Sequence, residues 1–373
     1  MTAGVDAGVV AACRAFAGDG ELEDVRPFGN GHIHATFLST FCSASGRRSF
    51  VHQRLNRVVF PDLESLMANL ARILGHIDGK LREGGGGAED RRRLSLVPAR
   101  DGLPWWRDAG GEMWRTTRLV PGASSHDLPR SPGDVYQAAR AYGSFQRHLL
   151  DLPAPPLVET IPAFHDPEAR LAALRRAVAR DAAGRAAGAA AEIAFAERHA
   201  DLAPALARLE RAGAIRARTI HNDTKLNNVL LDDETGEGLC VVDLDTTMPG
   251  IALADFGDLA RSATSAAAED EPDPSRAVVV PELFVAAARG FLDALGDLVT
   301  AAERESLGLA ARVLTYECGV RFLTDHLDGD RYFRVAHPDH NLQRCRTQFA
   351  LVASLESREG ELLRAIEDAE RRG

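Results

Sequence analysis

The sequence predicts an α+β protein with two lobes, a small and mostly antiparallel β lobe followed by a larger and mainly helical lobe. Three observations predict this fold. The chain has 373 residues, about two and a half times the length of a ~150-residue domain. Short apolar runs separated by turn residues cluster before residue 120. After that point, apolar residues at three- and four-residue steps dominate.

The segment before residue 120 is predicted to combine strands with two helices. Helical spacing occurs near residues 9–16 and again at 63–77, where Pro61-Asp62 is a helix start signal. Turn signals and apolar runs predict four strands, at residues 35–38, 49–52, 94–97 and 113–116, with a hairpin turn at 43–46. Val120-Pro121-Gly122 interrupts this pattern. We therefore place the lobes at 1–119 and 120–373, with a hinge near 116–122.

The second lobe begins its helical pattern at a clear start signal. Asp166, Pro167 and Glu168 supply an N-cap, a proline in the first turn and an acidic first turn. The following stretch, to about residue 212, is expected to hold two helices broken near 184–188. Apolar residues from Leu342 to Leu355 predict a last helix with one core face.

The composition excludes several classes of protein. Fifty-four Asp and Glu against 44 Lys and Arg give a formal charge of −10, which repels nucleic-acid phosphates. Five cysteines form no C-x-x-C pair and no signal peptide is recognised, which favours a reducing compartment. The longest charge-free run, residues 27–46, is too polar to span a membrane. We expect a cytoplasmic protein, a monomer or weak homodimer, that binds neither nucleic acid nor a membrane.

The most informative segment is a polar loop between two apolar runs at residues 219–231. A turn at 232–236 leads from it into a second strand, 239–242, which ends at Asp243. Such a hairpin brings Asp223, Asn228 and Asp243 to one end of the sheet. Kinases use this spacing for a base, a metal ligand and a second metal ligand. The alternative, a turn whose Asp and Asn side chains only cap their own backbone, is disfavoured by the strands on both sides.

Two neighbouring features receive structural roles. The ring of His221 is expected to bond backbone and hold the loop. Asp255-Phe256-Gly257 matches the kinase metal-binding tripeptide, but it follows 251–254 rather than the hairpin strand. We therefore expect Asp255 and Asp258 to cap the next helix and to bond the backbone of the catalytic loop.

A glycine-containing turn near the N-terminus is the candidate phosphate flap. Gly29, Gly31 and His32 lie where a strand–turn–strand element would cover phosphates, although glycines in a hairpin turn need no ligand. The assignment therefore depends on the downstream loop. His32 and His34 are disfavoured as a metal pair, because no third ligand has suitable spacing.

Taken together, these residues resemble the aminoglycoside phosphotransferase and choline kinase superfamily, and within it the N-acetylhexosamine 1-kinase group. The resemblance covers roughly residues 25–355. The shared segments are Gly31-His32-Ile33, Gln53-Arg54-Leu55-Asn56, His221 to Leu226, Val242 to Thr246, Asp255 to Asp258, Gly319 to Asp325 and Gly329 to Phe333. The resemblance implies a two-lobed, protein-kinase-like fold with a nucleotide-binding first lobe and a catalytic, acceptor-binding second lobe.

The same resemblance implies an activity. It is the transfer of the γ-phosphate of ATP to the anomeric hydroxyl of N-acetylglucosamine or N-acetylgalactosamine. Asp223 would be the base, and Asn228 and Asp243 would hold Mg²⁺. Arg321 and Tyr332 would reach the sugar, where an arginine supplies several fixed donors and a tyrosine adds a hydroxyl on an apolar ring. A surface ion pair and a core aromatic are the alternatives for these last two residues.

One departure from the kinase pattern concerns the lysine of the third strand. No lysine precedes Lys80, and Lys225 is the only other one. Gln53 or Arg54 must then take its place. Side chains alternate across a strand, so only one of the two faces the nucleotide, and the sequence leaves the choice open.

Two other functions are compatible with these motifs. An aminoglycoside or other natural-product acceptor would need an acidic pocket, which Asp325, Asp328 and Asp330 could provide. A nucleotide-binding pseudokinase is the third hypothesis. It is disfavoured because the base and both metal ligands are present.

Overall fold

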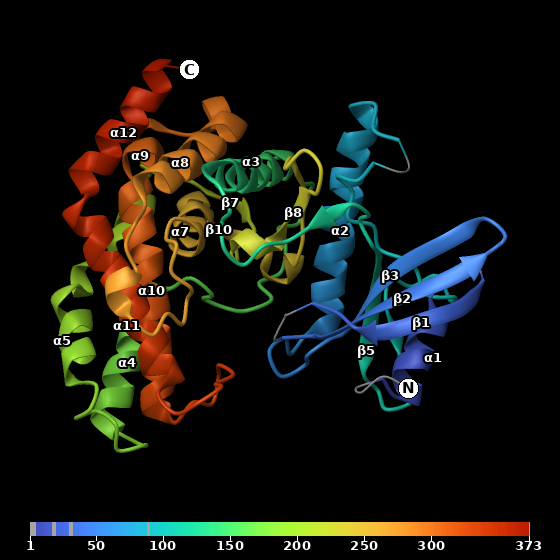
Figure 1. Ribbon diagram of the computed structural model, residues 1–373, viewed down its shortest axis with the longest axis horizontal. Helices are drawn as coiled ribbons and strands as arrows, with labels where there is room; N and C mark the ends of the chain where they lie inside the picture. The colour runs from blue at the N-terminus through green and yellow to red at the C-terminus, as the bar shows by residue number, and fades with distance from the viewer. Residues whose placement is uncertain (1–4, 17–19, 30–32, 88–89, 373) are drawn as a thin grey trace. The chain divides into compact units, whose positions relative to one another are not determined.

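The computed structural model describes residues 5–16, 20–29, 33–87 and 90–372 (Figure 1). The chain forms two compact units. The first is Met1–Gly122 with Asp151–Ile161, and the second is Ala123–Leu150 with Pro162–Gly373. The sequence predicts one division of the chain, between residues 119 and 120. It does not predict that Asp151–Ile161 belongs to the first unit.

The first unit contains a five-stranded antiparallel sheet in the order β1-β2-β3-β5-β4. Its aromatic core lies against α1 (Ala7–Ala15) and includes Phe37, Phe50 and Trp114. The predicted hairpin is present, with Ser43 opposite Gly46 at its turn. The strands are β1 (Glu21–Pro27), β2 (Ala35–Ser43), β3 (Gly46–Arg54), β4 (Trp106–Arg107) and β5 (Met113–Arg118).

The prediction of a strand at residues 94–97 is wrong. This segment makes only one bridge, between Leu96 and Thr117, with Val97 N–H donating to the Thr116 carbonyl. The next residue, Pro98, has no N–H and cannot continue the ladder. The segment therefore ends as a short edge contact with β5.

The long helix α2 (Leu63–Glu83) follows its predicted start, with Asp62 accepting a hydrogen bond from Ser65 N–H. The returning segment Asp151–Ile161 is bound to this helix. Asn69 donates to the Val158 carbonyl at 2.8 Å and accepts from Val158 N–H at 3.1 Å. Because this side chain satisfies both polar groups of Val158, it replaces the pairing that a neighbouring strand would provide.

The second unit is mainly helical, as predicted. The N-cap at Asp166 and the break before residue 190 are both present. The stretch to residue 212 holds a third helix, and a helix follows the one predicted to be last. The helices are α3 (Pro132–His148), α4 (Pro167–Arg180), α5 (Ala190–Arg198), α6 (Ala205–Arg211), α7 (Ala252–Ala263), α8 (Pro281–Leu295), α9 (Ala301–Glu305), α10 (Leu307–Asp328), α11 (His340–Ser357) and α12 (Glu359–Arg372).

Two small sheets in this unit frame the polar loop singled out in the sequence. The predicted hairpin forms between β8 (Val229–Asp232) and β9 (Gly238–Val241), with β6 (Ala123–Ser124) at its edge. The strand before the loop, β7 (Ala217–Ile220), pairs instead with β10 (Met248–Ile251). The loop therefore connects two sheets and must be held by side chains. Among the described residues, no helix is long and apolar enough to cross a membrane.

Candidate active site

The loop between β7 and β8, residues 221–228, is called the catalytic loop below. Asp255 in the first turn of α7 holds its beginning, accepting from His221 N–H at 3.0 Å and from Asn222 N–H at 2.8 Å. Gln146 of α3 donates to the same carboxylate at 2.8 Å. Burial raises the pKa of Asp255, although these bonds oppose it. Asp255 therefore bonds the loop backbone, as the sequence predicts.

His221 holds the loop through both ring nitrogens. Its Nε2 donates to the Val242 carbonyl at 2.9 Å, and its Nδ1 accepts from Asp223 N–H at 3.2 Å. A carbonyl only accepts and an N–H only donates, so this pair fixes the tautomer with the proton on Nε2. The predicted backbone-bonding role of His221 is therefore present.

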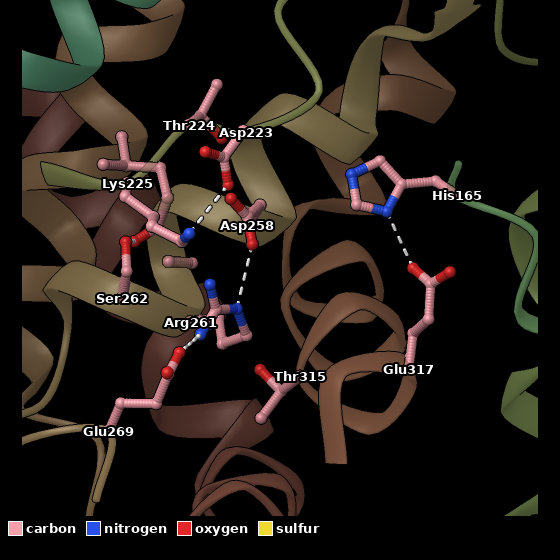
Figure 2. Close-up of polar contacts among 12 residues, drawn as sticks. His165, Asp223, Thr224, Lys225, Asp258, Arg261, Ser262, Glu269, Thr315 and Glu317 are labelled. Carbon is pink, nitrogen blue, oxygen red and sulfur yellow. Dashed lines mark hydrogen bonds and ion pairs between the residues drawn. The ribbon is translucent and has the colours of Figure 1, made fainter. Parts of the chain in front are cut away.

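Asp223 lies at the centre of the loop with the ammonium group of Lys225 beside it (Figure 2). Its Oδ1 is 3.0 Å from Nζ of Lys225, and its Oδ2 accepts from Nδ2 of Asn228 at 3.1 Å. Burial favours the neutral acid, but the nearby positive charges, Lys225 foremost, outweigh it and lower the pKa of Asp223 to about 2. The carboxylate is thus ionised at neutral pH.

Lys225 is a site residue that the sequence analysis did not single out. Its pKa is raised, first by Asp223 and then by Glu269 and Asp258, against the effect of burial. The Tyr142 hydroxyl donates to the Lys225 carbonyl at 2.6 Å and so fixes the backbone. The available signal was composition, because Lys225 is one of only two lysines in the chain.

Asp258 differs from its predicted role. It lies inside α7 rather than at its cap, and its Oδ1 accepts from Nε of Arg261 at 2.9 Å, while Arg261 also pairs with Glu269 (Figure 2). The N-cap of α7 is Ile251, which makes no side-chain capping bond, so the predicted capping of this helix by Asp255 and Asp258 is wrong. Asp258 therefore belongs to a charge cluster around Arg261 and cannot cap α7, because this helix begins at Ala252, six residues before Asp258.

Asn228 and Asp243 lie next to one another at the end of the hairpin. Val242 N–H donates to the Asn228 carbonyl at 2.9 Å, which places Asp243 one residue beyond this bond. Asp243 adopts a left-handed backbone with φ of 59°. Because Nδ2 of Asn228 points to Asp223, its Oδ1 is turned away from that carboxylate.

An amide oxygen and a carboxylate fit a hard divalent cation such as Mg²⁺, which takes one or two protein oxygens and completes its shell with phosphates and water. No group of three or more His, Cys, Asp or Glu among the described residues could hold a metal by itself. The oxygen pair therefore suits a cation that arrives with a phosphorylated ligand.

Arg321 and Tyr332 lie together on and after α10. The Arg321 guanidinium lies 5.4 Å from the Phe164 ring centroid, 5.9 Å from that of Tyr332 and 5.5 Å from that of Phe333. Tyr332 is 60% exposed, so it is not a core aromatic. Arg321 donates no hydrogen bond to any described residue, which leaves its donors for other oxygens.

The acidic residues that could receive a cationic acceptor already have partners. Asp325 accepts from the backbone N–H groups of residues 331–333 and from Asn341. Asp328 bonds Arg180 at 2.7 Å, and Asp330 bonds Arg185 and Asn341. These carboxylates therefore stabilise the turn that carries Tyr332.

In the first unit, Gln53 and Arg54 lie on opposite faces of β3. Arg54 lies 5.8 Å from the Trp114 ring, on the side of the α1 core, whereas Gln53 accepts from Nε of Arg115 at 2.8 Å on the other face. Arg115 is buried and was missed in the sequence, where it reads as an ordinary strand residue. Gly29 adopts φ of 75°, a conformation that suits glycine. Gly31 and His32 lie outside the described residues.

Solved structures with the same architecture include three phosphotransferases. A microcompartment-associated aminopropanol kinase has 18% identity and a TM-score of 0.56, covering 95% of this chain and 98% of its own. An aminoglycoside phosphotransferase from Alicyclobacillus acidocaldarius has 16% identity and a TM-score of 0.56, covering 95% and 96%. A spectinomycin phosphotransferase, solved with ADP and spectinomycin, has 10% identity and a TM-score of 0.55, covering 90% and 94%.

These matches confirm the predicted two-lobed fold. The model of the phosphotransferase enzyme family matches residues 24–279. This match confirms the resemblance to the aminoglycoside phosphotransferase and choline kinase superfamily, while the N-acetylhexosamine 1-kinase group stays a prediction. Because more than half of the chain is matched, the protein belongs to the phosphotransferase enzyme family and transfers a phosphoryl group to the hydroxyl of a small molecule.

Proposed function

We propose that this protein uses ATP and Mg²⁺ to phosphorylate the anomeric hydroxyl of an N-acetylhexosamine or a related sugar. The observation that carries the proposal is the Asp223 carboxylate, held ionised by Lys225 at 3.0 Å and oriented by Asn228 at 3.1 Å. ADP bound to the spectinomycin phosphotransferase of the same fold supports adenine nucleotide use. The motif resemblance supports the sugar.

Asp223 is the proposed catalytic base. A carboxyl with a pKa of about 2 is a weak base, so it would mainly orient the acceptor hydroxyl and take its proton late. An anomeric hydroxyl is more acidic than an ordinary alcohol and suits such a base. Lys225 neutralises the carboxylate before the phosphate charge arrives, which reduces the repulsion between them.

Asn228 and Asp243 are the proposed ligands of Mg²⁺. Bound there, the cation would neutralise phosphate charge during transfer. Two backbone contacts support this proposal: Val242 N–H donates to the Asn228 carbonyl, which places Asn228 beside the residue that precedes Asp243, and His221 holds the Val242 carbonyl.

The nucleotide-binding residues proposed in the first unit are Gly29, Gly31, His32 and either Gln53 or Arg54. The face of β3 opposite the α1 core favours Gln53, which is joined there by Arg115. Arg115 supplies the positive charge that an uncharged glutamine lacks. We infer that this pair does the work of the absent strand lysine.

The acceptor site is proposed at Arg321 and Tyr332. The unused donors of Arg321 suit sugar oxygens, and the exposed Tyr332 ring suits a sugar face. Burial, and then the nearby positive charge of Arg321, lower the pKa of Arg170, so two arginines lie close together here, whereas Asp325, Asp328 and Asp330 already have partners. This distribution of charge disfavours polycationic aminoglycosides and supports a neutral acceptor.

The direct test is a phosphorus NMR spectrum after incubation with Mg-ATP, N-acetylglucosamine and N-acetylgalactosamine. We expect a sugar phosphate coupled to the anomeric proton, and loss of this signal when EDTA removes the metal. Phosphorylation of aminoglycosides alone would instead support the natural-product alternative. Nucleotide binding without turnover of any acceptor would support a pseudokinase.

Asp223→Asn tests the base itself. Because this change removes the proton acceptor and keeps the shape, kcat should fall by about 10²- to 10⁴-fold with an unchanged unfolding temperature. Asp233→Asn, on the exposed turn after β8, is the matched control and should keep full activity. Full activity of Asp223→Asn would exclude Asp223 as the base.

A further inference from the structure

His165, in the segment just before α4, contacts the catalytic loop from outside it. Its Nε2 lies 2.6 Å from the carbonyl oxygen of Asn222. Its Nδ1 lies 2.8 Å from Oε2 of Glu317 on α10, a contact that Figure 2 shows. Both side chains are largely buried, with exposures of 12% for His165 and 2% for Glu317. The ring therefore links the loop to the long helix α10.

The chemistry of the two partners determines the state of the ring. A backbone carbonyl only accepts, and an ionised carboxylate only accepts, so both ring nitrogens must donate. A histidine that donates twice carries both protons and a positive charge. Burial opposes this charge most strongly, but Glu317, with help from Asp258, outweighs it and raises the pKa of His165.

The bond from His165 acts on the peptide group directly before Asp223. The Asn222 carbonyl and the Asp223 N–H belong to the same planar unit. His165 binds its oxygen, and Nδ1 of His221 binds its N–H at 3.2 Å. Asn222 has φ of 68°, a left-handed conformation that surrounding contacts must maintain. Two histidines thus fix the plane from which the Asp223 side chain projects.

The other end of this link lies beside the proposed acceptor residue. Glu317 precedes Arg321 by four residues on α10, and the two charges interact. The charged groups around His165 are Glu317 and Arg321 on α10, Asp258 on α7 and Arg170 on α4, whose Nε lies 3.9 Å from Glu317 Oε1. Glu317 is therefore placed between the loop and the acceptor residue.

We propose that His165, held by Glu317, is a positioning residue that fixes the direction of the Asp223 carboxylate, and that it does so only while its ring carries both protons. This inference rests on the proposed function, in which Asp223 is the base. Loss of one proton would remove the donation to Asn222 or to Glu317. Activity should then fall as the pH rises through the titration of His165.

Kinetics of three variants test this proposal. His165→Gln should lower kcat by about 10- to 100-fold with little change in the KM for ATP, because the misdirected base affects the chemical step. Glu317→Gln should move the alkaline limb of the kcat profile to lower pH, since the carboxylate that stabilises the imidazolium is gone. A purely structural role would lower activity equally at every pH.

His199→Gln is the matched control. His199 is also placed between a backbone carbonyl, Phe195 at 2.9 Å from Nδ1, and a glutamate, Glu356 at 3.3 Å from Nε2. It makes no contact with the catalytic loop among its described interactions. This variant should keep the wild-type kcat and pH profile.

Two measurements do not depend on turnover and so separate this inference from the proposed function. Nitrogen-detected NMR of the wild-type histidines should show His165, assigned by its loss in His165→Gln, titrating above its ordinary value. Hydrogen exchange of the peptide covering 221–228 should accelerate in His165→Gln and not in His199→Gln. If both results are obtained but the wild-type protein phosphorylates no sugar, the proposed sugar kinase activity is wrong and the inference about His165 stands.

The inference would be overturned by either of two results. A wild-type His165 that is neutral at pH 7 would show that the ring does not donate twice. Unchanged exchange of the 221–228 peptide in His165→Gln would show that the ring does not hold the loop. If His165→Gln does not fold, the alkaline limb of the kcat profile in Glu317→Gln, compared with wild type and His199→Gln, still decides the question.

Discussion

Charge balance at single residues sets the chemistry of the catalytic loop. Asp223 is buried, and burial alone would keep its carboxyl neutral. Lys225, two residues later in the chain, reverses this preference at a distance of 3.0 Å. Neither residue can be understood alone, because each shifts the pKa of the other toward its charged form.

Lys225→Met should make this dependence visible. With the nearest cation removed, burial should raise the pKa of Asp223 from about 2 toward or above its ordinary value of 3.8. The base acts only when it is deprotonated, so activity is lost as the pH falls through its pKa. The acidic limb of the kcat/KM profile should therefore move to higher pH. The pH profile of kcat/KM with Mg-ATP and acceptor measures this shift.

The chain offers one matched control, because its only other lysine is Lys80. Lys80 pairs with Asp151 in the first unit. Lys80→Met should leave the acidic limb unchanged. An unshifted limb in Lys225→Met would mean that other groups keep Asp223 ionised.

At the scale of elements, close helix contacts explain the Asp255-Phe256-Gly257 sequence. A Cβ built on Gly257 would lie 2.5 Å from the Ala310 carbonyl oxygen and 2.9 Å from its carbon. Glycine here lets α7 approach the backbone of α10, while Asp255 bonds the catalytic loop. The tripeptide therefore joins the helical core to the loop.

Gly257→Ala should destabilise the protein by about 1–3 kcal/mol, because the added methyl group forces the two helices apart. Gly75→Ala is the control of opposite sign. A Cβ at Gly75, inside α2, meets nothing within 4 Å, so alanine should add roughly 0.5–1 kcal/mol of helix stability. Urea unfolding of both variants tests the pair. A stable Gly257→Ala protein would show that α7 can move at little cost.

The β sheet of the first unit contains a buried histidine that should make its stability depend on pH. His52 on β3 bonds the Ser39 hydroxyl and the Thr116 hydroxyl, each at 2.7 Å. Burial lowers the pKa of His52 from 6.5 to about 4, so the ring is neutral in the folded state. Its two hydroxyl partners let the neutral ring satisfy both nitrogens inside the core.

The folded pKa lies below the unfolded one, so the unfolded state binds more protons between pH 6.5 and about 4. The contribution of His52 to the free energy of unfolding should be fully present above pH 6.5. It should decrease as the pH falls to about 4, by about 3 kcal/mol at most. His52→Gln should remove this slope. Unfolding free energies across this range measure it, and an equal slope in both proteins would contradict the assignment.

At the scale of the whole molecule, the net charge of −10 does not extend to the proposed acceptor site. Arginines 170 and 321 lie there, and the nearby aspartates bind backbone, arginine or asparagine groups. Glu317 beside these arginines offsets part of their positive charge, so the site should attract neither a polycation nor a polyanion strongly. The site itself should select by hydrogen bonds rather than by charge.

Salt dependence tests this selection. The KM for a neutral sugar should change by less than about two-fold between about 0.1 M and about 1 M salt, over which the screening length falls from about 10 to about 3 Å. A KM that rises strongly with salt would indicate that charge attraction binds the acceptor. Steady-state kinetics at fixed Mg-ATP would distinguish the two results.

The sequence by itself determined the features that depend on neighbours in the chain. The β2–β3 hairpin, the N-caps at Asp62 and Asp166 and the β8–β9 hairpin are local, so turn residues and periodicity predict them. The same hairpin places Asn228 opposite Val242, the residue before Asp243, and Asn228 also bonds Asp223, while the roles of these three residues stay a prediction.

Only the tertiary structure decided the features that join distant parts of the chain. His165 meets residues 57 and 152 positions away, and Asn69 meets Val158 across 89 positions. The separation of Gln53 from Arg54, the place of Asp258 in a charge cluster and the need for glycine at 257 follow from packing. The physical reason is that local propensity specifies backbone conformation over a few residues, whereas burial and hydrogen-bond partners depend on which elements come together.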